Sequence, residues 1–104
     1  MIPVEPQFQV TVDEDGAVVV AGEIDLASCD ELSTQIRAAL DDAGPTFVVD
    51  LAGVVFMDSS GLGLLLKIRE TCTGRDVAFV LRDPSAAVRR LLDITGLTHE
   101  LRII

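Results

Sequence analysis

The sequence predicts a single α/β domain: a mixed β-sheet, opened by an N-terminal hairpin and continued by parallel central strands, packed with α-helices. A chain of 104 residues with 49% hydrophobic residues is the size of one compact domain with its own core. Apolar runs of strand length alternate with amphipathic segments of helix length after the first two runs. No repeat or linker interrupts this pattern, so we treat residues 1–104 as one domain.

The first two strands are expected to form a hairpin. Apolar and polar side chains alternate over residues 8–12, which is typical of an edge strand with one face in water. The Asp15-Gly16 step then offers a residue that tolerates positive φ, and residues 17–21 are apolar throughout. The two runs therefore predict an outer strand followed by an inner one.

The clearest amphipathic helix of the chain follows Gly22. Its apolar side chains recur at helical spacing and are Cys29, Leu32, Ile36, Ala39 and Leu40. Gly44-Pro45 ends this helix, and residues 47–49 form a short β-branched run of the kind found in strands buried on both faces. We expect the apolar segment 53–57 that comes later to lie mostly in the core.

Two more helices and two more strands complete the pattern. Asp58, Ser59 and Ser60 supply capping side chains for a helix that ends at Gly74. Residues 77–81 predict a third buried strand, a helix follows Pro84-Ser85 and stops at Gly96, and residues 101–104 can close the sheet. In parallel sheets, binding sites gather where strands end and helices begin, which directs attention to the turns at 22–26 and 57–63.

The charge of the chain excludes some classes of partner. Its 17 acidic and 8 basic side chains give a net charge of −9, which repels nucleic acids and anionic membrane surfaces. All basic residues lie from Arg37 onward, so the acidic first third suits a basic protein surface. The N-terminus lacks the features of a secretory signal and no apolar run reaches membrane-spanning length, which predicts a cytoplasmic protein without membrane insertion.

The cysteines predict neither a metal site nor a redox motif. Cys29 and Cys72 fall in different predicted helices, no C-x-x-C spacing occurs, and the chain has one histidine. We therefore expect no metal and no cofactor. Two buried core thiols are the favoured interpretation, and a regulatory disulfide stays open because the sequence does not give the Cα separation.

The segment from Phe56 to Gly63 conflicts with simple helix stability. Its two glycines fall in one helical turn, and each costs about 1 kcal/mol relative to alanine inside a helix, which suggests close approach by another backbone such as a partner chain. Two adjacent hydroxyls sit where free backbone N–H groups and the positive end of the helix dipole would stabilise a phosphate. The alternative is an ordinary N-cap, in which Asp58 or Ser59 accepts from the first-turn amides and the glycines pack against the sheet.

The residues do not predict an enzyme. The single histidine, His99, lies near the C-terminus, and Ser59 lacks the Gly-x-Ser-x-Gly surroundings of a hydrolase nucleophile. The glycines fit neither the phosphate-binding loop nor the dinucleotide fingerprint. We therefore expect a binding protein without a catalytic site.

The chain resembles the STAS family and, within it, the anti-sigma factor antagonists. The resemblance rests on residues 22–25 (GEID), on 48–51 (VVDL) with 55–63 (VFMDSSGLG), and on 85–91 (SAAVRRL) with Gly96-Leu97. It implies a STAS domain over residues 1–104 and a partner-switching cycle in bacterial stress or sporulation responses. The unphosphorylated antagonist captures an anti-sigma factor and so frees a sigma factor for transcription, and phosphorylation reverses this.

The resemblance also implies partners and site residues. The anti-sigma factor would itself be a serine kinase that phosphorylates the serine directly after the aspartate, here Ser59, and a metal-dependent serine/threonine phosphatase would restore the active form. Asp58 would orient or activate the hydroxyl, Asp25 would lie nearby on the kinase-facing surface, and Ser60 would cap or support the loop. The partner-binding residues implied are Asp25, Asp58, Ser59, Ser60, Gly61, Leu62 and Gly63.

A second function stays open beside the antagonist. The same fold is similar to accessory subunits of membrane lipid or solute transport complexes, which dock on an ATPase. The two are distinguished by a phosphorylatable hydroxyl after Asp58, which Ser59 provides and Ser60 doubles. This feature favours the antagonist.

Overall fold

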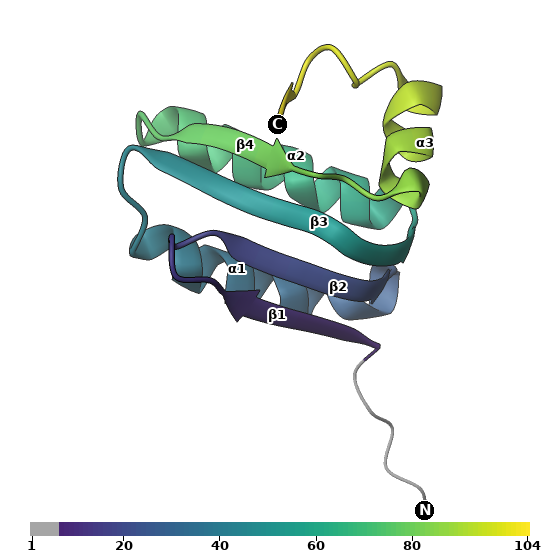
Figure 1. The fold of residues 1–104 in the computed structure, drawn as a ribbon, viewed down its shortest axis with the longest axis horizontal. Coiled ribbons are helices and arrows are strands. Elements are labelled where there is room, and N and C mark those ends of the chain that lie inside the picture. Colours follow the sequence, from purple (N-terminus) through teal and green to yellow (C-terminus); the bar gives the residue numbers. More distant parts are fainter. Residues whose placement is uncertain (1–6) are drawn as a thin grey trace, which may run out of the picture.

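Five strands form one sheet in the chain order β1-β2-β3-β4-β5 in the computed structural model, which describes residues 7–104 (Figure 1). The elements are β1 (Phe8–Val12), β2 (Val18–Ile24), the 3-10 helix η1 (Leu26–Ser28), α1 (Cys29–Asp41), β3 (Thr46–Met57), α2 (Ser59–Gly74), β4 (Ala78–Arg82), α3 (Ala86–Thr95) and β5 (Arg102–Ile103). β1 pairs antiparallel with β2, and every other neighbouring pair is parallel. This is the mixed sheet that the sequence predicts.

The predicted hairpin is confirmed, and its turn is stabilised both by the positive φ of Gly16 and by hydrogen bonds to the Asp13 side chain. Gly16 adopts a φ of +84° at the turn. The Asp13 carboxylate accepts hydrogen bonds from the backbone N–H groups of Asp15 and Ala17, at 3.0 and 2.9 Å. The pairing runs without a shift from Phe8 opposite Gly22 to Val12 opposite Val18. Asp13 therefore fixes the turn through its side chain as well as its backbone.

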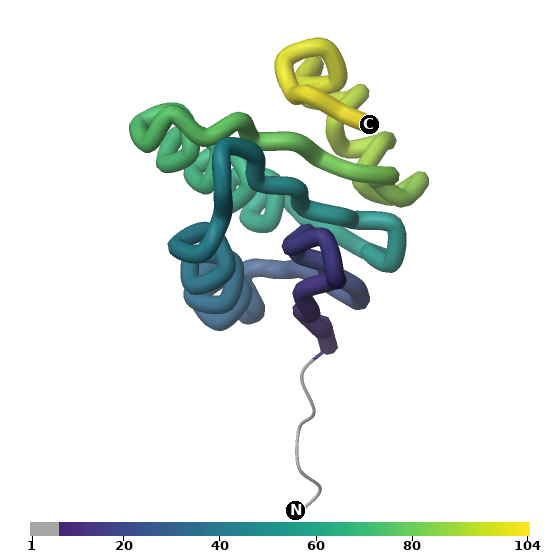
Figure 2. The backbone as a smooth tube through the Cα atoms, turned by 60° about the vertical axis from the view of Figure 1, so that its left-hand side comes forward, coloured from purple at the N-terminus to yellow at the C-terminus, as the bar shows by residue number. Residues whose placement is uncertain are grey.

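The core lies between the sheet and α1 and α2, which lie next to each other behind the sheet in Figure 1. Side chains that are less than 2% exposed on β2, β3, β4, α1 and α2 include Val18, Val49, Leu81, Ile36 and Ile68. α3 lies beside β3, and the chain after it turns back so that β5 lies against β4 (Figure 2). All three helices bury apolar side chains in the same core.

β3 is longer and less regular than expected. The sequence predicts a short strand at 47–49, whereas β3 extends over 12 residues to Met57. The expectation that 53–57 lies mostly in the core is wrong, because Gly53 is exposed, Val55 is 69% exposed and Phe56 is 49% exposed. Register shifts in the pairing with β2 interrupt the alternation of side chains, so two successive large apolar residues point outward.

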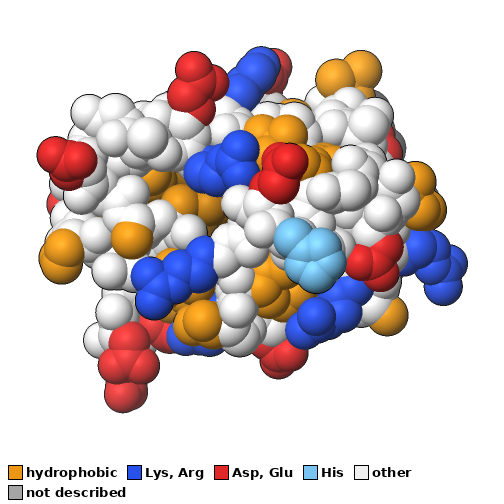
Figure 3. Space-filling model, turned by 90° about the horizontal axis from the view of Figure 1, so that it is seen from above, with side chains coloured by type: hydrophobic (Ala, Val, Ile, Leu, Met, Phe, Trp, Pro, Cys, Tyr) orange, Lys and Arg blue, Asp and Glu red, His pale blue; other side chains and the backbone are white. Residues whose placement is uncertain are grey.

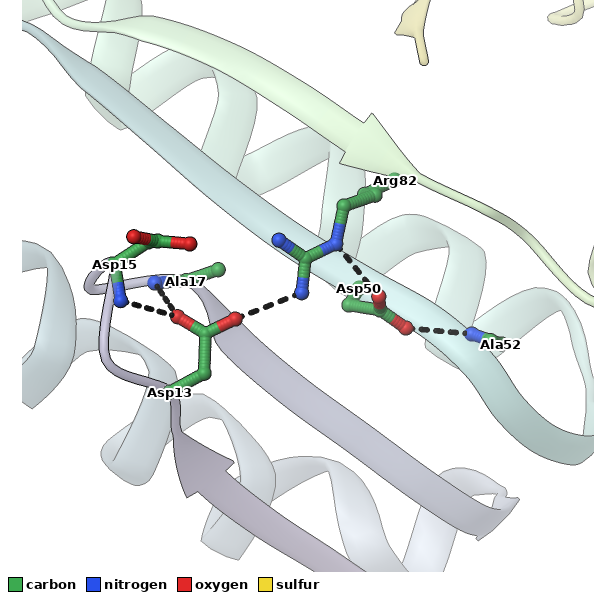
Figure 4. A network of polar contacts seen from close by, with 6 residues as sticks. All are labelled: Asp13, Asp15, Ala17, Asp50, Ala52 and Arg82. Carbon is green, nitrogen blue, oxygen red and sulfur yellow. Dashed lines mark hydrogen bonds and ion pairs between the residues drawn. The ribbon is translucent and has the colours of Figure 1, made fainter.

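Arg82 joins the hairpin to the parallel part of the sheet (Figure 4). Its Nε donates to Asp50 Oδ2 at 2.7 Å, and its Nη2 donates to Asp13 Oδ2 at 2.8 Å. Asp50 is its direct neighbour on β3, whereas Asp13 belongs to the turn between β1 and β2. The hydrogen bond from Arg82 is the main cause of a lowered pKa of Asp13.

The two cysteines occupy different environments. Cys72 is fully buried, as expected, but Cys29 is only partly buried at the start of α1. Both are free thiols. α1 and α2 begin at the same edge of the sheet, and Cys72 lies near the far end of α2, about 20 Å along the helix. A disulfide needs Cα atoms within about 7 Å, so the folded chain does not permit this bridge.

We expect Arg82→Gln to lower stability in a way that depends on pH. The depressed pKa of Asp13 gives stability that is present above its ordinary value of 3.8 and is lost as the pH falls below it. The wild type should therefore exceed the variant in urea midpoint at neutral pH, and the difference should shrink below pH 3.8.

Arg75→Gln is the matched control for this variant. Arg75 pairs with Asp41 at 2.9 Å, but the two side chains are 49% and 66% exposed, so the loss should be small. Urea unfolding followed by circular dichroism measures both. A difference between wild type and Arg82→Gln that is constant from neutral to acid pH would contradict the assigned role of the Asp13 contact.

Candidate functional site

The carboxyl ends of β2 and β3 lie side by side and bring the two predicted turns together. Ile24 pairs with Met57 as the last residue of each strand, and the Asp58 N–H donates to the Ile24 carbonyl at 3.2 Å. An aspartate follows each strand, Asp25 after β2 and Asp58 after β3. The predicted meeting of the two turns at one edge of the sheet is confirmed.

Asp25 caps the short helix η1. Its Oδ1 accepts from the Ser28 N–H at 3.0 Å, and the Ser28 Oγ accepts from the Asp25 N–H at 2.9 Å. This reciprocal capping box satisfies two backbone donors that would otherwise lack a partner. This capping role of Asp25 was not predicted from the sequence, although the Asp-x-x-Ser spacing is a signal that could have indicated it.

Asp58 caps α2 through its carboxylate alone. Its Oδ1 accepts from the backbone N–H groups of Ser60 and Gly61, at 2.9 and 3.2 Å. The N-cap alternative therefore describes the helix start, and the expectation that these N–H groups are free for a phosphate is wrong. Within residues 7–104, no hydrogen bond links Asp58 to the Ser59 hydroxyl.

Ser59 is the first residue of α2 and is exposed, while Ser60 is half-buried. The residues that the resemblance implies for partner binding do not share one environment. Asp25, Asp58, Ser59, Ser60 and Gly63 reach the surface, whereas Gly61 and Leu62 are buried. The first group surrounds the start of α2, and the second belongs to the core beneath it.

The two glycines of α2 have different surroundings. A Cβ on Gly61 would lie 2.7 Å from Met57 Cγ and 2.8 Å from Ile24 Cγ2, so the missing side chain lets α2 approach the ends of β2 and β3. A Cβ on Gly63 would meet no atom within 4 Å. The close approach that the sequence suggests is therefore within the chain at Gly61, and Gly63 has no such contact.

The start of α2 lies in a negative field. Burial, followed by the nearby carboxylates of Asp58, Asp25 and Asp30, raises the pKa of the Cys29 thiol above its ordinary value. The thiol is therefore protonated at neutral pH and is a poor nucleophile. Asp58 directly precedes Ser59, and Asp25 follows the residue that pairs with Met57, so these two carboxylates would also act on a charge added to Ser59.

Exposed apolar side chains flank the aspartates. Leu26, directly after Asp25, is 74% exposed, and Val55 and Phe56, at the end of β3, are 69% and 49% exposed. Apolar groups beside charged ones at a strand edge are typical of protein contact surfaces. Val55 and Phe56 were expected in the core because the irregular pairing of β3 with β2 is not visible in the sequence.

His99 lies away from Ser59. It is exposed in the loop before β5, and the Arg69 Nη1 donates to the carbonyl of the next residue, Glu100, at 3.2 Å. Arg69 lies ten residues after Ser59 in α2, or about 15 Å along the helix. On the face that carries the histidine, acidic, basic and apolar side chains are interspersed (Figure 3).

Residues 7–104 contain neither a metal-ligand cluster nor a membrane-spanning helix. Residues 7–104 contain no group of three or more His, Cys, Asp or Glu side chains placed to hold a metal ion. Within the same residues, no helix combines the length and the apolar character needed to cross a bilayer. The edge of the sheet at Asp25, Asp58 and Ser59 is the candidate site because two strand ends, two capping carboxylates and exposed apolar side chains meet there.

Nearly the whole chain matches a known protein family. The family described as "Mlab, STAS domain" matches residues 8–104, which is nearly the whole chain. The chain therefore belongs to the STAS domain family.

Relatives with the same fold are named anti-sigma factor antagonists. The anti-sigma-B factor antagonist of Staphylococcus epidermidis is 33% identical over 94 residues, covering 90% of this chain and 87% of that protein. The crystal structure of an anti-sigma factor antagonist from Mycobacterium paratuberculosis is 33% identical, with a TM-score of 0.78 over 92% of this chain and 84% of that one. These similarities confirm the predicted resemblance.

The antagonist SpoIIAA is similar in two chemical states. Its unphosphorylated form is 27% identical, with a TM-score of 0.71 over 93% of this chain and 87% of that one. The structure of the Bacillus protein in its phosphorylated form is 26% identical, with a TM-score of 0.66 over 93% of this chain and 90% of that one. The fold of this chain is thus similar to both states.

The contrast between the two glycines predicts opposite effects of the same substitution. Gly61→Ala should destabilise the fold by about 1–3 kcal/mol, because the new methyl group overlaps Ile24 and Met57. Gly63→Ala should stabilise it by about 0.5–1 kcal/mol, since alanine is the better helix former and the space is open. Urea unfolding of both variants measures this, and shifts of the same sign would contradict the packing described.

Proposed function

We propose that this protein is an anti-sigma factor antagonist that is switched by phosphorylation of Ser59. In the unphosphorylated form it binds an anti-sigma factor with serine kinase activity in the cytoplasm, and a sigma factor is released. Phosphate on Ser59 ends this binding, and a serine/threonine phosphatase restores it. The protein acts by binding and not as an enzyme.

One observation carries the proposal: the Ser59 hydroxyl is exposed at a helix start that another residue already caps. Asp58 makes the capping hydrogen bonds to Ser60 and Gly61, so the fold does not need the Ser59 side chain. A kinase can therefore modify Ser59 without unfolding α2. The names of the relatives and the two states of SpoIIAA support the same function.

The electrostatics of the site support a switch by local repulsion. A phosphate adds ~1.5 to 2 negative charges and three acceptor oxygens. Near Ser59 it would lie in the field of Asp25 and Asp58, and the N–H groups of Ser60 and Gly61, which could offset this charge, already donate to Asp58. A penalty of roughly 3 to 4 kcal/mol for desolvating this charge at an interface corresponds to about a hundredfold to thousandfold loss of affinity.

The position of the phosphate tests the first part of the proposal. Purified protein is incubated with ATP and each anti-sigma kinase of its source organism, and phosphate is located by mass spectrometry. We expect phosphate on Ser59, no phosphate on Ser59→Ala, and normal labelling of Ser60→Ala as the matched control. Labelling of Ser59→Ala would place the switch elsewhere, and no labelling by any kinase would favour the transport-accessory role.

The effect of a negative charge at position 59 on affinity tests the second part of the proposal, that phosphorylation ends binding to the anti-sigma factor. Ser59→Asp should bind the anti-sigma factor at least tenfold more weakly than wild type, whereas Ser59→Ala should bind with unchanged affinity, because only the first adds charge. Titration calorimetry gives the affinities, and thermal unfolding shows whether both variants keep the fold. An aspartate variant that is folded and binds as tightly as wild type would exclude charge at Ser59 as the switch.

A further inference from the structure

A groove runs between α1 and α2 from the edge of the sheet that carries Ser59. It has a volume of about 440 Å³. Leu26, Asp30 and Ser60 line it near the start of the helices, Gly63 and Leu64 line its middle, and Lys67 and Arg37 line it further along. The α1–α2 groove is therefore continuous with the surface around Ser59.

Gly63 keeps the groove open. Inside a helix it costs about 1 kcal/mol relative to alanine, and no neighbour within the chain requires the small residue, because a Cβ there would meet no atom within 4 Å. Gly61, one half-turn earlier, is different, since its missing side chain is explained by Ile24 and Met57. The absence of a side chain at 63 leaves space for an atom from outside the chain.

The far part of the groove is positively charged in a chain of net charge −9. Arg37 donates to Ser33 Oγ and to Thr71 Oγ1, both at 3.1 Å, which holds its guanidinium between the two helices. Within residues 7–104, neither Arg37 nor Lys67 forms an ion pair with a carboxylate. The groove therefore has an acidic side chain, Asp30, near the start of α1 and two cations, Arg37 and Lys67, without an ion pair at its far end.

We propose that the α1–α2 groove is the docking site of a segment of the anti-sigma factor that places an apolar side chain over Gly63 and an acidic side chain beside Lys67 and Arg37. This rests on the proposed function and names the chemistry of the partner segment. The apolar side chain fills the open space between Leu26 and Leu64, and the acidic one neutralises the two cations. Contacts in the groove contribute the binding affinity, and the phosphorylation state of Ser59 at its entrance regulates whether the anti-sigma factor binds.

Filling the groove is the direct test. Gly63→Leu projects a side chain into the groove, and Gly74→Leu is the matched control, because a Cβ on Gly74 at the end of the same helix also meets no atom within 4 Å. Each variant is titrated with the anti-sigma factor that phosphorylates Ser59. We expect Gly63→Leu to bind at least thirtyfold more weakly than wild type, and Gly74→Leu to bind within twofold of it.

Charge reversal in the groove gives a second measurement on an exposed residue. Lys67→Glu should weaken binding about tenfold while leaving the thermal unfolding midpoint unchanged, because Lys67 is exposed and unpaired within residues 7–104. Substitution of the contacting acidic residue of the anti-sigma factor by lysine should restore the affinity of this variant. Failure of every acidic-to-lysine variant to do so would overturn the assigned charge pairing.

The outcomes separate this proposal from the proposed function. If Gly63→Leu is folded and binds like wild type, while Ser59→Asp binds weakly, the groove is not the docking site and the switch stands. If wild type binds no anti-sigma factor, both proposals are overturned. A wild-type dimer in sedimentation that Gly63→Leu abolishes would show that a second copy occupies the groove, and would also overturn this proposal.

Discussion

The contact of Gly61 with Ile24 and Met57 determines where the site lies. Because this glycine has no side chain, the first turn of α2 packs directly on the final residues of the two neighbouring strands. That approach places Asp58 where its backbone N–H reaches the Ile24 carbonyl and its carboxylate reaches the first-turn amides. The exposed position of Ser59, directly after Asp58, follows from this packing.

The two aspartates of the site have a structural role that does not depend on a partner. Asp25 and Asp58 each cap the helix that follows a strand, and their charges make the edge of the sheet acidic. Loss of an N-cap costs about 0.5–2 kcal/mol, so a substitution at either aspartate changes stability and surface charge together. Ser59 makes no capping bond, which is why a change there reports on charge alone.

Much of the fold follows from local patterns in the sequence, but the contacts between distant residues do not. Periodicity and capping residues predict the hairpin, the order of helices and strands, and the position of Ser59. The length of β3 is not predictable in this way, since its register shifts depend on pairing with β2 and leave Val55 and Phe56 outside. Arg82 contacts Asp13 across 69 positions of sequence, and no local pattern indicates such a bond. Similarly, the different surroundings of Gly61 and Gly63 exist only once α2 packs on the sheet.

The division of α2 into two faces explains how a switch can operate without refolding. Gly61, Leu65 and Ile68 face the core, whereas Ser60, Gly63 and Lys67 face the groove. A phosphate at the exposed start of the helix would alter the second face and leave the packing of the first intact. Under the proposed function, the fold would stay the same in both states, and binding would change because a charge appears beside a surface that must lose its water to be bound.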